Sequence, residues 1–309
     1  MKTLILHHDD CIKHEPGRRH PEAPARITAV LNGVKNLPGT EILPAPRATL
    51  EQLQLAHAPE YWERLLELEP APEPGENRVA ADPDTFLSAG SIDATLRGSG
   101  AACFAIDQIF AGKVKNAFCA IRPPGHHAGV ETAMGFCLLN HAAVATRHAL
   151  TTHGVQRVAI LDFDVHHGNG TQAIFEASPE VLYISSHQMP LYPGTGYPAE
   201  TGCGNILNLP LVPGAGSVEF RAAWSGHGLT ALEHFGPDLI VISAGFDAHE
   251  RDPLGQIELQ DEDYGWITSE ICAYAASACG GRVVSILEGG YDLDALASAS
   301  AAHVTALTN

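Results

Sequence analysis

The most constraining feature of this sequence is a series of short apolar runs, each of which ends in a polar stretch rich in histidine, aspartate or glycine. Short and fully apolar runs are typical of strands that are buried on both faces of a sheet. Longer segments with helical character lie between them, and this alternation predicts an α/β fold with a parallel sheet covered by helices on both faces. The expected strands are Leu4–Leu6, Ala117–Ile121, Val158–Leu161, Val181–Ile184, Leu239–Ile242 and Val283–Leu287, and the expected helices are Ala23–Lys35, Pro59–Glu69, Ser88–Gly112, His141–Thr152, Val218–His234, Asp261–Cys279 and Asp292–Leu307.

Parallel sheets of this kind bind ligands beyond the carboxyl ends of their strands. The chain concentrates its histidine and aspartate residues at those ends, so we expect the functional site there. The 309 residues suit one large domain or two small ones. The most linker-like stretch, Glu69–Asn77, precedes most of the expected strands, and we therefore interpret it as a surface loop within a single domain that spans residues 1–309.

Composition excludes several classes of function. The formal net charge is −18 and no basic cluster is present, so direct binding of nucleic acid is not expected, whereas a cationic substrate is weakly favoured. The 7 cysteines are scattered and form no C-x-x-C pair, which argues against a disulfide framework or a thiolate zinc site. We see neither a membrane-spanning apolar stretch nor a signal peptide, so we expect a cytoplasmic protein without a membrane partner. A homo-oligomer is compatible with the sequence.

The segment from Asp162 to Thr171 reads D-F-D-V-H-H-G-N-G-T and directly follows the apolar run Val158–Leu161. If the chain stays extended there, the side chains of Asp162, Asp164 and His166 project to one side. Carboxylates and imidazoles are ligands that zinc prefers. Capping of the next helix would explain one carboxylate, but not the D-x-D-x-H pattern followed by a second histidine.

Asp247 is the best candidate for a further metal ligand, because it follows the expected strand Leu239–Ile242 within S-A-G-F-D. Two carboxylates and one imidazole suit Zn²⁺ at roughly 2.0–2.2 Å from each donor. Such an ion polarises a carbonyl group and lowers the pKa of the water that it binds. An ordinary loop carboxylate is the alternative for Asp247 taken alone.

His126 and His127 follow two prolines and a glycine, and imidazole is the usual general base near neutral pH. Asp162 is the natural partner for one of them, since a carboxylate that accepts the ring N–H fixes the tautomer. Tyr291 follows L-E-G-G, and its hydroxyl group can donate a hydrogen bond to an oxyanion. A structural role explains Tyr291 equally well.

Two aromatic residues stand beside glycines on expected loops: Phe136 follows Gly135, and Tyr192 lies within L-Y-P-G-T-G. These residues can form the walls of a narrow channel for an aliphatic chain. Packing under the loops is the alternative.

Together, the motifs R-P-P-G-H-H-A, D-F-D-V-H-H-G-N-G-T, S-A-G-F-D and L-E-G-G-Y-D resemble those of the histone deacetylase superfamily, which has the arginase/deacetylase fold. The similarity runs from His20 to Tyr291 and is closest to class II deacetylases and bacterial acetoin-utilisation-like amidohydrolases. It implies zinc on three ligands: Asp164, His166 and Asp247. It also implies a catalytic group made of His126, His127, Asp162 and Tyr291, with His127 as general base and acid and Tyr291 holding the acetyl carbonyl.

The resemblance assigns further residues around this centre. Gly135, Phe136 and Tyr192 would line the substrate channel, and Asp84 would bind the substrate backbone at its rim. Arg26, within H-P-E-A-P-A-R, would line the inner cavity through which acetate leaves. A potassium ion would be held by Asp162, Ser185 and backbone oxygens around Asp164 and His166.

Three positions depart from relatives in this superfamily. Tyr192 stands where phenylalanine is commoner, and it adds a polar group to the channel wall. Asn169 replaces the aspartate of class I enzymes, which leaves His127 with a neutral partner and a pKa that is raised less. Leu254 stands where a polyamine-selective relative has a glutamate, which argues against acetylpolyamine substrates.

We therefore predict a zinc-dependent amidohydrolase that removes acetyl or other short acyl groups from an acylated amine, with the N-acetyl-lysine side chain of a protein or peptide as the first candidate. The same chemistry on a small acetylated amine is the main alternative. A dimanganese ureohydrolase is disfavoured, because the Asp247 segment lacks a close D-x-D partner. A non-catalytic binding module is disfavoured, because the metal ligands and Tyr291 are all retained.

Overall fold

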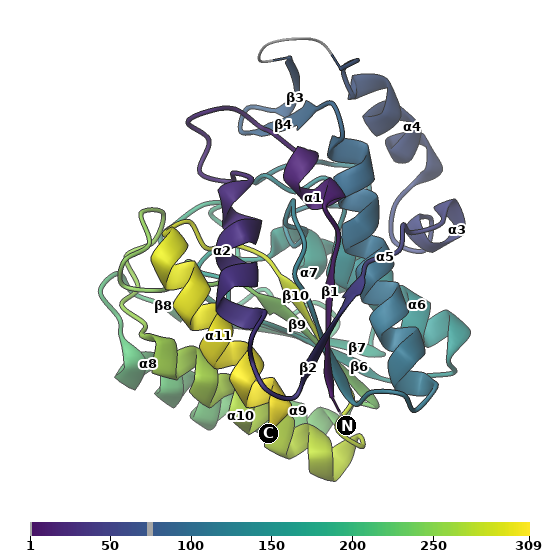
Figure 1. Ribbon diagram of the computed structural model, residues 1–309. Helices are drawn as coiled ribbons and strands as arrows, with labels where there is room; N and C mark the ends of the chain where they lie inside the picture. Colours follow the sequence, from purple (N-terminus) through teal and green to yellow (C-terminus); the bar gives the residue numbers. More distant parts are fainter. Residues whose placement is uncertain (1, 73–76) are drawn as a thin grey trace.

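The computed structural model describes residues 2–72 and 77–309, which form a parallel sheet flanked by helices (Figure 1). The strands are β1 Thr3–His7, β2 Thr40–Pro44, β3 Arg78–Asp82, β4 Thr85–Ser88, β5 Asn116–Cys119, β6 Val158–Asp162, β7 Val181–Gln188, β8 Ile206–Leu211, β9 Leu239–Ala244 and β10 Val283–Leu287. Eight of them form one sheet in the order β2-β1-β5-β10-β9-β6-β7-β8, in which every neighbouring pair is parallel. β3 and β4 form a separate antiparallel hairpin.

Helices cover both faces of this sheet, as Figure 1 shows. They are α1 Asp10–Lys13, α2 Ala25–Val34, α3 Leu50–Leu53, α4 Pro59–Leu68, α5 Ser91–Phe110, α6 His141–Thr152, α7 Asn169–Phe175, α8 Ser217–Ala223, the π-helical turn η1 Trp224–Gly228, α9 Leu229–Phe235, α10 Asp261–Ala278 and α11 Leu293–Thr308. α2, α10 and α11 pack together on one face, and α5 and α6 pack together on the other.

Each central strand contributes side chains to a core on both faces. Along β6, Val158 and Ile160 belong to the core beneath α5 and α6, whereas Ala159 and Leu161 belong to the core beneath α10 and α11. All four side chains are fully buried. The strand therefore reads as a continuous apolar run and not as an alternating one, because neither face meets water.

The structure confirms the predicted α/β architecture with a parallel sheet, and it adds elements that the apolar runs did not indicate. β2 is an edge strand whose side chains are half-buried or exposed. β8 is a continuous strand, but Asn208 and Pro210 interrupt the apolar run in its sequence. The single helix expected over Val218–His234 is divided by η1, whose sequence contains Gly226 and Gly228. The expected surface loop Glu69–Asn77 includes residues 73–76, which lie outside the described residues.

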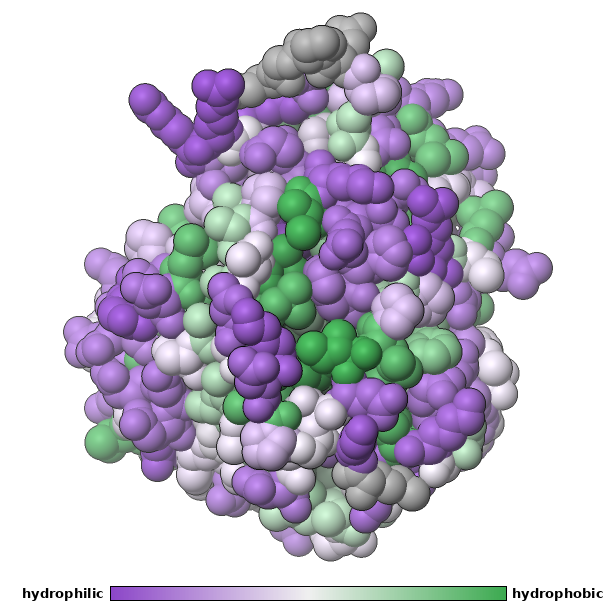
Figure 2. Space-filling view, in the orientation of Figure 1, coloured by the Kyte–Doolittle hydropathy of each residue, from purple (hydrophilic) through white to green (hydrophobic). Residues whose placement is uncertain are grey.

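Figure 2 shows that most of one face is hydrophilic, and that apolar side chains gather near its middle.

Helix packing around α11 provides a test of the fold with two matched glycines. A Cβ atom at Gly33 in α2 would overlap the backbone carbonyl of Ala297 in α11, whereas a Cβ atom at Gly265 in α10 would lie 3.8–3.9 Å from Ala302. We expect Gly33→Ala to lower the free energy of unfolding by about 1–3 kcal/mol, as overpacking does. We expect Gly265→Ala to raise it by up to about 1 kcal/mol, because alanine favours helix more than glycine does. Urea unfolding of both variants measures the difference, and a loss of equal size in both would contradict this packing.

Candidate active site

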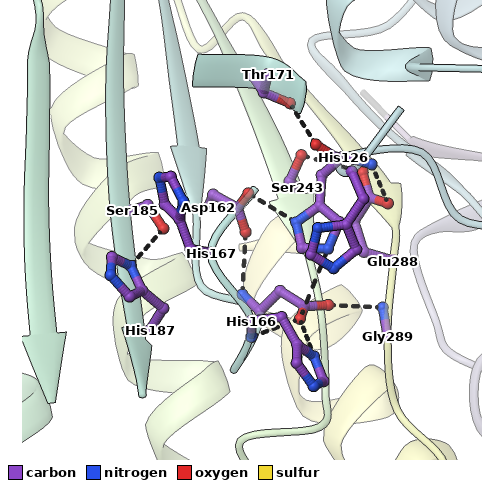
Figure 3. A network of polar contacts seen from close by, with 12 residues as sticks. His126, Asp162, His166, His167, Thr171, Ser185, His187, Ser243, Glu288 and Gly289 are labelled. Carbon is purple, nitrogen blue, oxygen red and sulfur yellow. Dashed lines mark hydrogen bonds and ion pairs between the residues drawn. The ribbon is translucent and has the colours of Figure 1, made fainter. Parts of the chain in front are cut away.

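The predicted catalytic and metal-binding residues come together on loops at the carboxyl edge of four adjacent strands, β5, β10, β9 and β6. His126 and His127 follow β5, Tyr291 follows β10, Asp247 follows β9, and Asp164 and His166 follow β6. Figure 3 shows His126 beside Asp162 and Glu288 at these strand ends, with His166 on the neighbouring loop. Residues that lie far apart in the sequence are therefore neighbours at one edge of the sheet.

Asp164, His166 and Asp247 form a compact group of potential metal ligands. The Nδ1 atom of His166 lies 3.1 Å from Oδ1 of Asp164 and 3.1 Å from Oδ2 of Asp247. All three residues are buried, and one donor atom from each lies within 4.8 Å of the others. Two carboxylate oxygens and one imidazole nitrogen are a donor set that fits Zn²⁺.

The two carboxylates are held in place by backbone amides and by neighbouring glycines. The amide of Gly289 donates to Asp164 Oδ2 at 2.8 Å, and the amide of Val165 donates to Asp247 Oδ1 at 2.9 Å. A Cβ atom at Gly245 would collide with the carboxylate of Asp164, and one at Gly289 would collide with both carboxylates. These glycines leave room for the donor group, and the amides fix its orientation.

The backbone that carries Asp164 and His166 differs from the extended conformation that we expected. β6 ends at Asp162, and Asp164 and His166 lie on a bend and not on an extended strand. The bend is stabilised by the side chains themselves, since Asp162 accepts from the amide of Asp164 at 3.1 Å and Asp164 accepts from the amide of His166 at 2.9 Å. The carboxylates do not cap the next helix, because α7 begins at Asn169 without a side-chain cap.

His126 is paired with the carboxylate predicted to be its partner. Its Nδ1 atom lies 3.0 Å from Oδ2 of Asp162, which also accepts a hydrogen bond from the hydroxyl of Tyr183 at 2.9 Å. Burial alone would lower the pKa of His126, but the charges of Asp164 and Asp162 raise it to about 10. His126 is therefore an imidazolium ion at neutral pH in the metal-free protein.

His127 has the opposite electrostatic environment. Its Nδ1 atom lies 2.8 Å from Oδ1 of Asn169, a neutral acceptor, and its ring centroid lies 4.1 Å from that of His126. Burial, together with the positive charges of His126 and His166, lowers the pKa of His127 well below its ordinary value. His127 is therefore neutral, and its Nε2 atom is available to accept a proton.

Glu288 is a buried polar residue of this site that the sequence analysis did not single out. Its carboxylate accepts from the amides of Gly125 at 2.6 Å and His126 at 3.1 Å, and from the hydroxyl of Ser243 at 3.1 Å. Burial raises the pKa of Glu288 to about 7. The residue directly follows β10 and links the loop after β5 to the end of β9. Its position in L-E-G-G before Tyr291 was the available signal.

A pocket of about 240 Å³ leads from the surface to this group of residues. Its lining contains the predicted substrate-binding residues, three of the predicted catalytic or metal-binding residues, and Leu191, which was not predicted. The lining residues are Asp84, His127, Gly135, Phe136, His166, Leu191, Tyr192, Leu254 and Tyr291. The ring of Tyr192 stands edge-on to that of His127 with centroids 5.2 Å apart, and the ring of Phe136 stands edge-on to that of Tyr291 at 5.9 Å. Two aromatic walls therefore border the approach to the candidate metal ligands.

The Phe136 wall is built on a strained backbone. Phe136 has φ = 68°, and no other non-glycine residue in the described parts of the chain has a positive φ. Asp84 accepts from the amide of Gly135 at 3.1 Å, and the hydroxyl of Thr85 accepts from the amide of Phe136 at 3.0 Å. Strain of this kind costs about 1–3 kcal/mol and persists only where the surroundings enforce it. Asp84 thus lines the pocket and also orients the channel wall.

Tyr291 is oriented from two sides. Asp252 accepts from the amide of Tyr291 at 2.6 Å and from that of Leu254 at 3.0 Å, so it joins the segments on either side of the pocket. The guanidinium group of Arg26 lies 4.9 Å from the centre of the Tyr291 ring. Arg26 is completely buried and donates to the carbonyls of Glu288 and Gly290, so it lies behind the tyrosine.

The expected potassium site stays a prediction. Asp162 and Ser185 are paired across β6 and β7, but the hydroxyl of Ser185 contacts Nδ1 of His187 at 2.9 Å. The carboxylate of Asp162 already contacts His126 and Tyr183. These contacts give no independent support for a cation there.

Comparison with known proteins identifies the family. A family model described as the histone deacetylase domain matches residues 20–307. The chain belongs to the histone deacetylase family. The histone deacetylase resemblance predicted from the motifs is confirmed.

Individual relatives agree with this assignment. A probable deacetylase of Archaeoglobus fulgidus is 38% identical over 303 residues, which cover 95% of this chain and 82% of the relative. A histone deacetylase-like amidohydrolase of Pseudomonas aeruginosa is 39% identical over 277 residues, which cover 88% of this chain and 71% of the relative. The crystal structure of the HDA15 HD domain matches with a TM-score of 0.90 and 36% identity, over 99% of this chain and 90% of that one.

This deacetylase-family chain therefore has the arginase/deacetylase fold, and it is a deacetylase or amidohydrolase of that family. Within the described residues, none of its helices is both long enough and apolar enough to span a membrane. The cytoplasmic location expected from the sequence stays a prediction.

The electrostatics of this histone deacetylase site predict proton release on metal binding. Burial would lower the pKa of His166, but its hydrogen bonds to Asp164 and Asp247 raise the pKa to about 10, so the ring carries a proton at pH 7 in the metal-free protein. A metal ion must displace that proton, and we expect about one proton or more to be released with the first equivalent of Zn²⁺. Because the raised pKa of His166 favours its protonated form, we expect zinc affinity to decrease as the pH falls from about 9 to 6.

Isothermal titration calorimetry in buffers of different ionisation enthalpy measures the number of protons released on zinc binding. Zinc uptake that is independent of both buffer and pH would contradict the assignment of His166 as a ligand.

Proposed function

We propose that the protein is a zinc-dependent amidohydrolase that removes acetyl or other short acyl groups from amines, and that its preferred substrate class is the N-acetyl-lysine side chain. We further propose that residues 1–309 act as one deacetylase domain. One observation carries the proposal: a cluster of three potential metal ligands lies beside two adjacent histidines, and His127, His166 and Tyr291 line the same narrow pocket.

Asp164, His166 and Asp247 would hold the zinc ion. Their two carboxylates would nearly neutralise its charge. When bound, zinc supplies a Lewis acid for the acyl carbonyl and lowers the pKa of water in its coordination shell.

His127 is suited to move the proton. A hydrogen bond from Nδ1–H to Oδ1 of Asn169 leaves a lone pair on Nε2, which accepts a proton from the attacking water. His127 then delivers this proton to the nitrogen of the leaving amine as the acyl C–N bond breaks. The products are a carboxylic acid and a free amine, so atoms and protons balance.

His126 and Tyr291 would stabilise the negative charge that develops on the acyl oxygen. The positive charge of His126 is maintained by Asp162, and so it lowers the energy of a nearby oxyanion without giving up its proton. Burial raises the pKa of Tyr291 well above its usual value, so its hydroxyl stays protonated and can donate to that oxygen.

The pocket supports a linear acylated amine as the substrate. Phe136, Tyr192 and Leu254 offer apolar contacts along its walls, which suit the methylene chain of a lysine. The half-exposed hydroxyl-bearing ring of Tyr192 adds a polar group near the mouth. Asp84 at the rim would accept hydrogen bonds from a substrate backbone, although one of its oxygens is already used by Gly135.

Two alternatives receive less support. Deacetylation of a small acetylated amine would use the same centre, but the apolar Leu254 gives a polyamine cation no charged partner. A dimanganese ureohydrolase needs carboxylates that bridge two ions about 3.5–4 Å apart. In the described residues, the donor cluster at this edge consists of Asp164, His166 and Asp247 alone.

Replacement of Tyr291 tests the mechanism. We expect Tyr291→Phe to reduce kcat by roughly a hundredfold or more, because one oxyanion donor is lost, while the zinc content is retained. Tyr192→Phe is the matched control, since it removes a hydroxyl from the same pocket but not from the reacting centre, and we expect it to keep kcat within about threefold. Rates on an acetyl-lysine peptide and metal analysis of both variants provide the measurement. Near-normal turnover by Tyr291→Phe would refute its role.

A comparison of two substrates tests the proposed preference for the N-acetyl-lysine side chain. We expect kcat/KM for acetyl-lysine peptides to exceed that for acetylspermidine by about tenfold or more, because Leu254 offers no charge to a polyamine. The variant Leu254→Glu places a carboxylate at this position. We expect the carboxylate to attract the polyamine cation and so to reduce the ratio of kcat/KM for the peptide to kcat/KM for acetylspermidine. A faster reaction of the unaltered protein with acetylspermidine would reverse the assignment and favour small acetylated amines.

A further inference from the structure

A second cluster of potential metal ligands lies away from the catalytic pocket, where α5 and α6 end. Asp107 belongs to the last turn of α5, His148 lies near the end of α6, and His153 directly follows α6. The Nε2 atoms of His148 and His153 lie 2.8 Å and 2.7 Å from the same oxygen, Oδ1 of Asp107. α5 and α6 run next to one another in Figure 1, and both lead into strands, so this cluster lies at the edge of the sheet where strands begin.

The donor chemistry of this cluster matches a surface metal site. Two imidazole nitrogens and one carboxylate oxygen are typical ligands of Zn²⁺ and of related ions such as Co²⁺ and Ni²⁺. The side chain of His148 is 8% exposed and that of His153 is 19% exposed, whereas that of Asp107 is 41% exposed. The cluster is therefore anchored by the two histidines and opens to solvent at the aspartate, where water can complete the coordination.

The distances allow an ion to enter with a small movement. Ligand atoms about 2.0–2.1 Å from a tetrahedral ion lie roughly 3.3 Å from one another. The two imidazole nitrogens are about 0.5 Å closer than that to the Asp107 oxygen, and the Asp107 side chain is 41% exposed, so a small outward rotation of it would make room for the ion. In the proposed catalytic zinc site, Nδ1 of His166 lies 3.1 Å from an oxygen of each carboxylate, so imidazole and carboxylate donors are also close together there.

The surroundings orient both imidazoles. The hydroxyl oxygen of Thr152 lies 3.3 Å from Nδ1 of His148, and an N–H bond there leaves the lone pair on Nε2, which faces Asp107. The ring of His153 stacks on that of Phe110, with centroids 4.8 Å apart and an angle of 16° between the planes. Both donor atoms are thus directed at the carboxylate before any ion is bound.

The ends of the two helices provide an electrostatic reason for a cation at this place. The carboxyl end of an α-helix carries a partial negative charge, and both α5 and α6 end beside the cluster. The carboxylate of Asp107 adds a full negative charge. A divalent cation would be attracted by all three sources.

We propose that Asp107, His148 and His153 form a second site for a divalent metal ion such as Zn²⁺ or Co²⁺, and that the bound ion links the end of α5 to the end of α6. This site stabilises the fold and takes no part in catalysis, because it lies at the opposite edge of the sheet from the catalytic pocket. The competing explanation is that the two imidazoles simply donate hydrogen bonds to one carboxylate without an ion.

Cobalt binding to the full chain separates these explanations. The protein is stripped of metal and titrated with Co²⁺, whose visible absorption and bound amount are recorded. We expect two ions per chain in the unaltered protein and one in Asp107→Asn, whose amide keeps a hydrogen-bond acceptor but removes the charged ligand. His153→Ala should also bind one ion, and Asp93→Asn, at a carboxylate of similar exposure in the first turn of α5, should bind two.

Two further measurements locate the second ion and its effect. We expect saturating Co²⁺ to raise the Tm of Asp247→Asn, in which the catalytic cluster is disrupted, by roughly 5 °C, and to leave the Tm of the double variant Asp107→Asn/Asp247→Asn nearly unchanged. The zinc-loaded Asp107→Asn single variant should keep its deacetylase rate within about twofold. The ion count rests in part on the proposed catalytic site, so the decisive quantity is the difference between the unaltered protein and the variants. An equal number of ions in the unaltered protein, Asp107→Asn and His153→Ala would overturn the proposal, whether or not the catalytic site binds a metal.

Discussion

Buried negative charge at the carboxyl edge of the sheet is the constraint on which the site depends. Four carboxyl groups lie almost completely buried there: Asp162, Asp164, Asp247 and Glu288. Burial of an ionised carboxylate is costly unless cations and N–H donors compensate it. The compensation comes from backbone amides on three loops and from the imidazoles of His126 and His166. A divalent cation would complete this balance, and so the protein environment itself favours a metal ion.

The same charges give the two adjacent histidines different protonation states. His126 lies beside Asp162 and Asp164 and keeps its proton, whereas His127 lies beside Asn169 and the charged His126 and loses it. Two neighbouring imidazolium rings would repel each other, so the position of the carboxylates decides which ring is charged. The pair can therefore supply a base and an electrostatic stabiliser from one H-H dipeptide, as general acid–base chemistry requires.

The two edges of the sheet have different physical characters. At the carboxyl edge, loops with glycines and a strained Phe136 bring polar groups close together around a pocket. At the opposite edge, α5 and α6 end in a cluster that links two helices. Strain and unbalanced charge are therefore concentrated where chemistry is expected, and cross-linking contacts lie where they add to stability without disturbing the pocket.

The sequence by itself determined the parallel α/β architecture and the family, and it predicted the candidate metal donors, because buried strands and short motifs leave local patterns such as D-x-D-x-H. It missed β2 and β8, whose half-exposed or interrupted strands lack a continuous apolar run. Only the tertiary structure decided which atoms meet. It determined the bend after β6 and the contacts of Asp162. It also determined the role of Glu288, which accepts hydrogen bonds from the amides of Gly125 and His126, more than 160 positions earlier in the chain. Such contacts depend on strand order and on the protonation of buried groups, and neither is a local property of the chain.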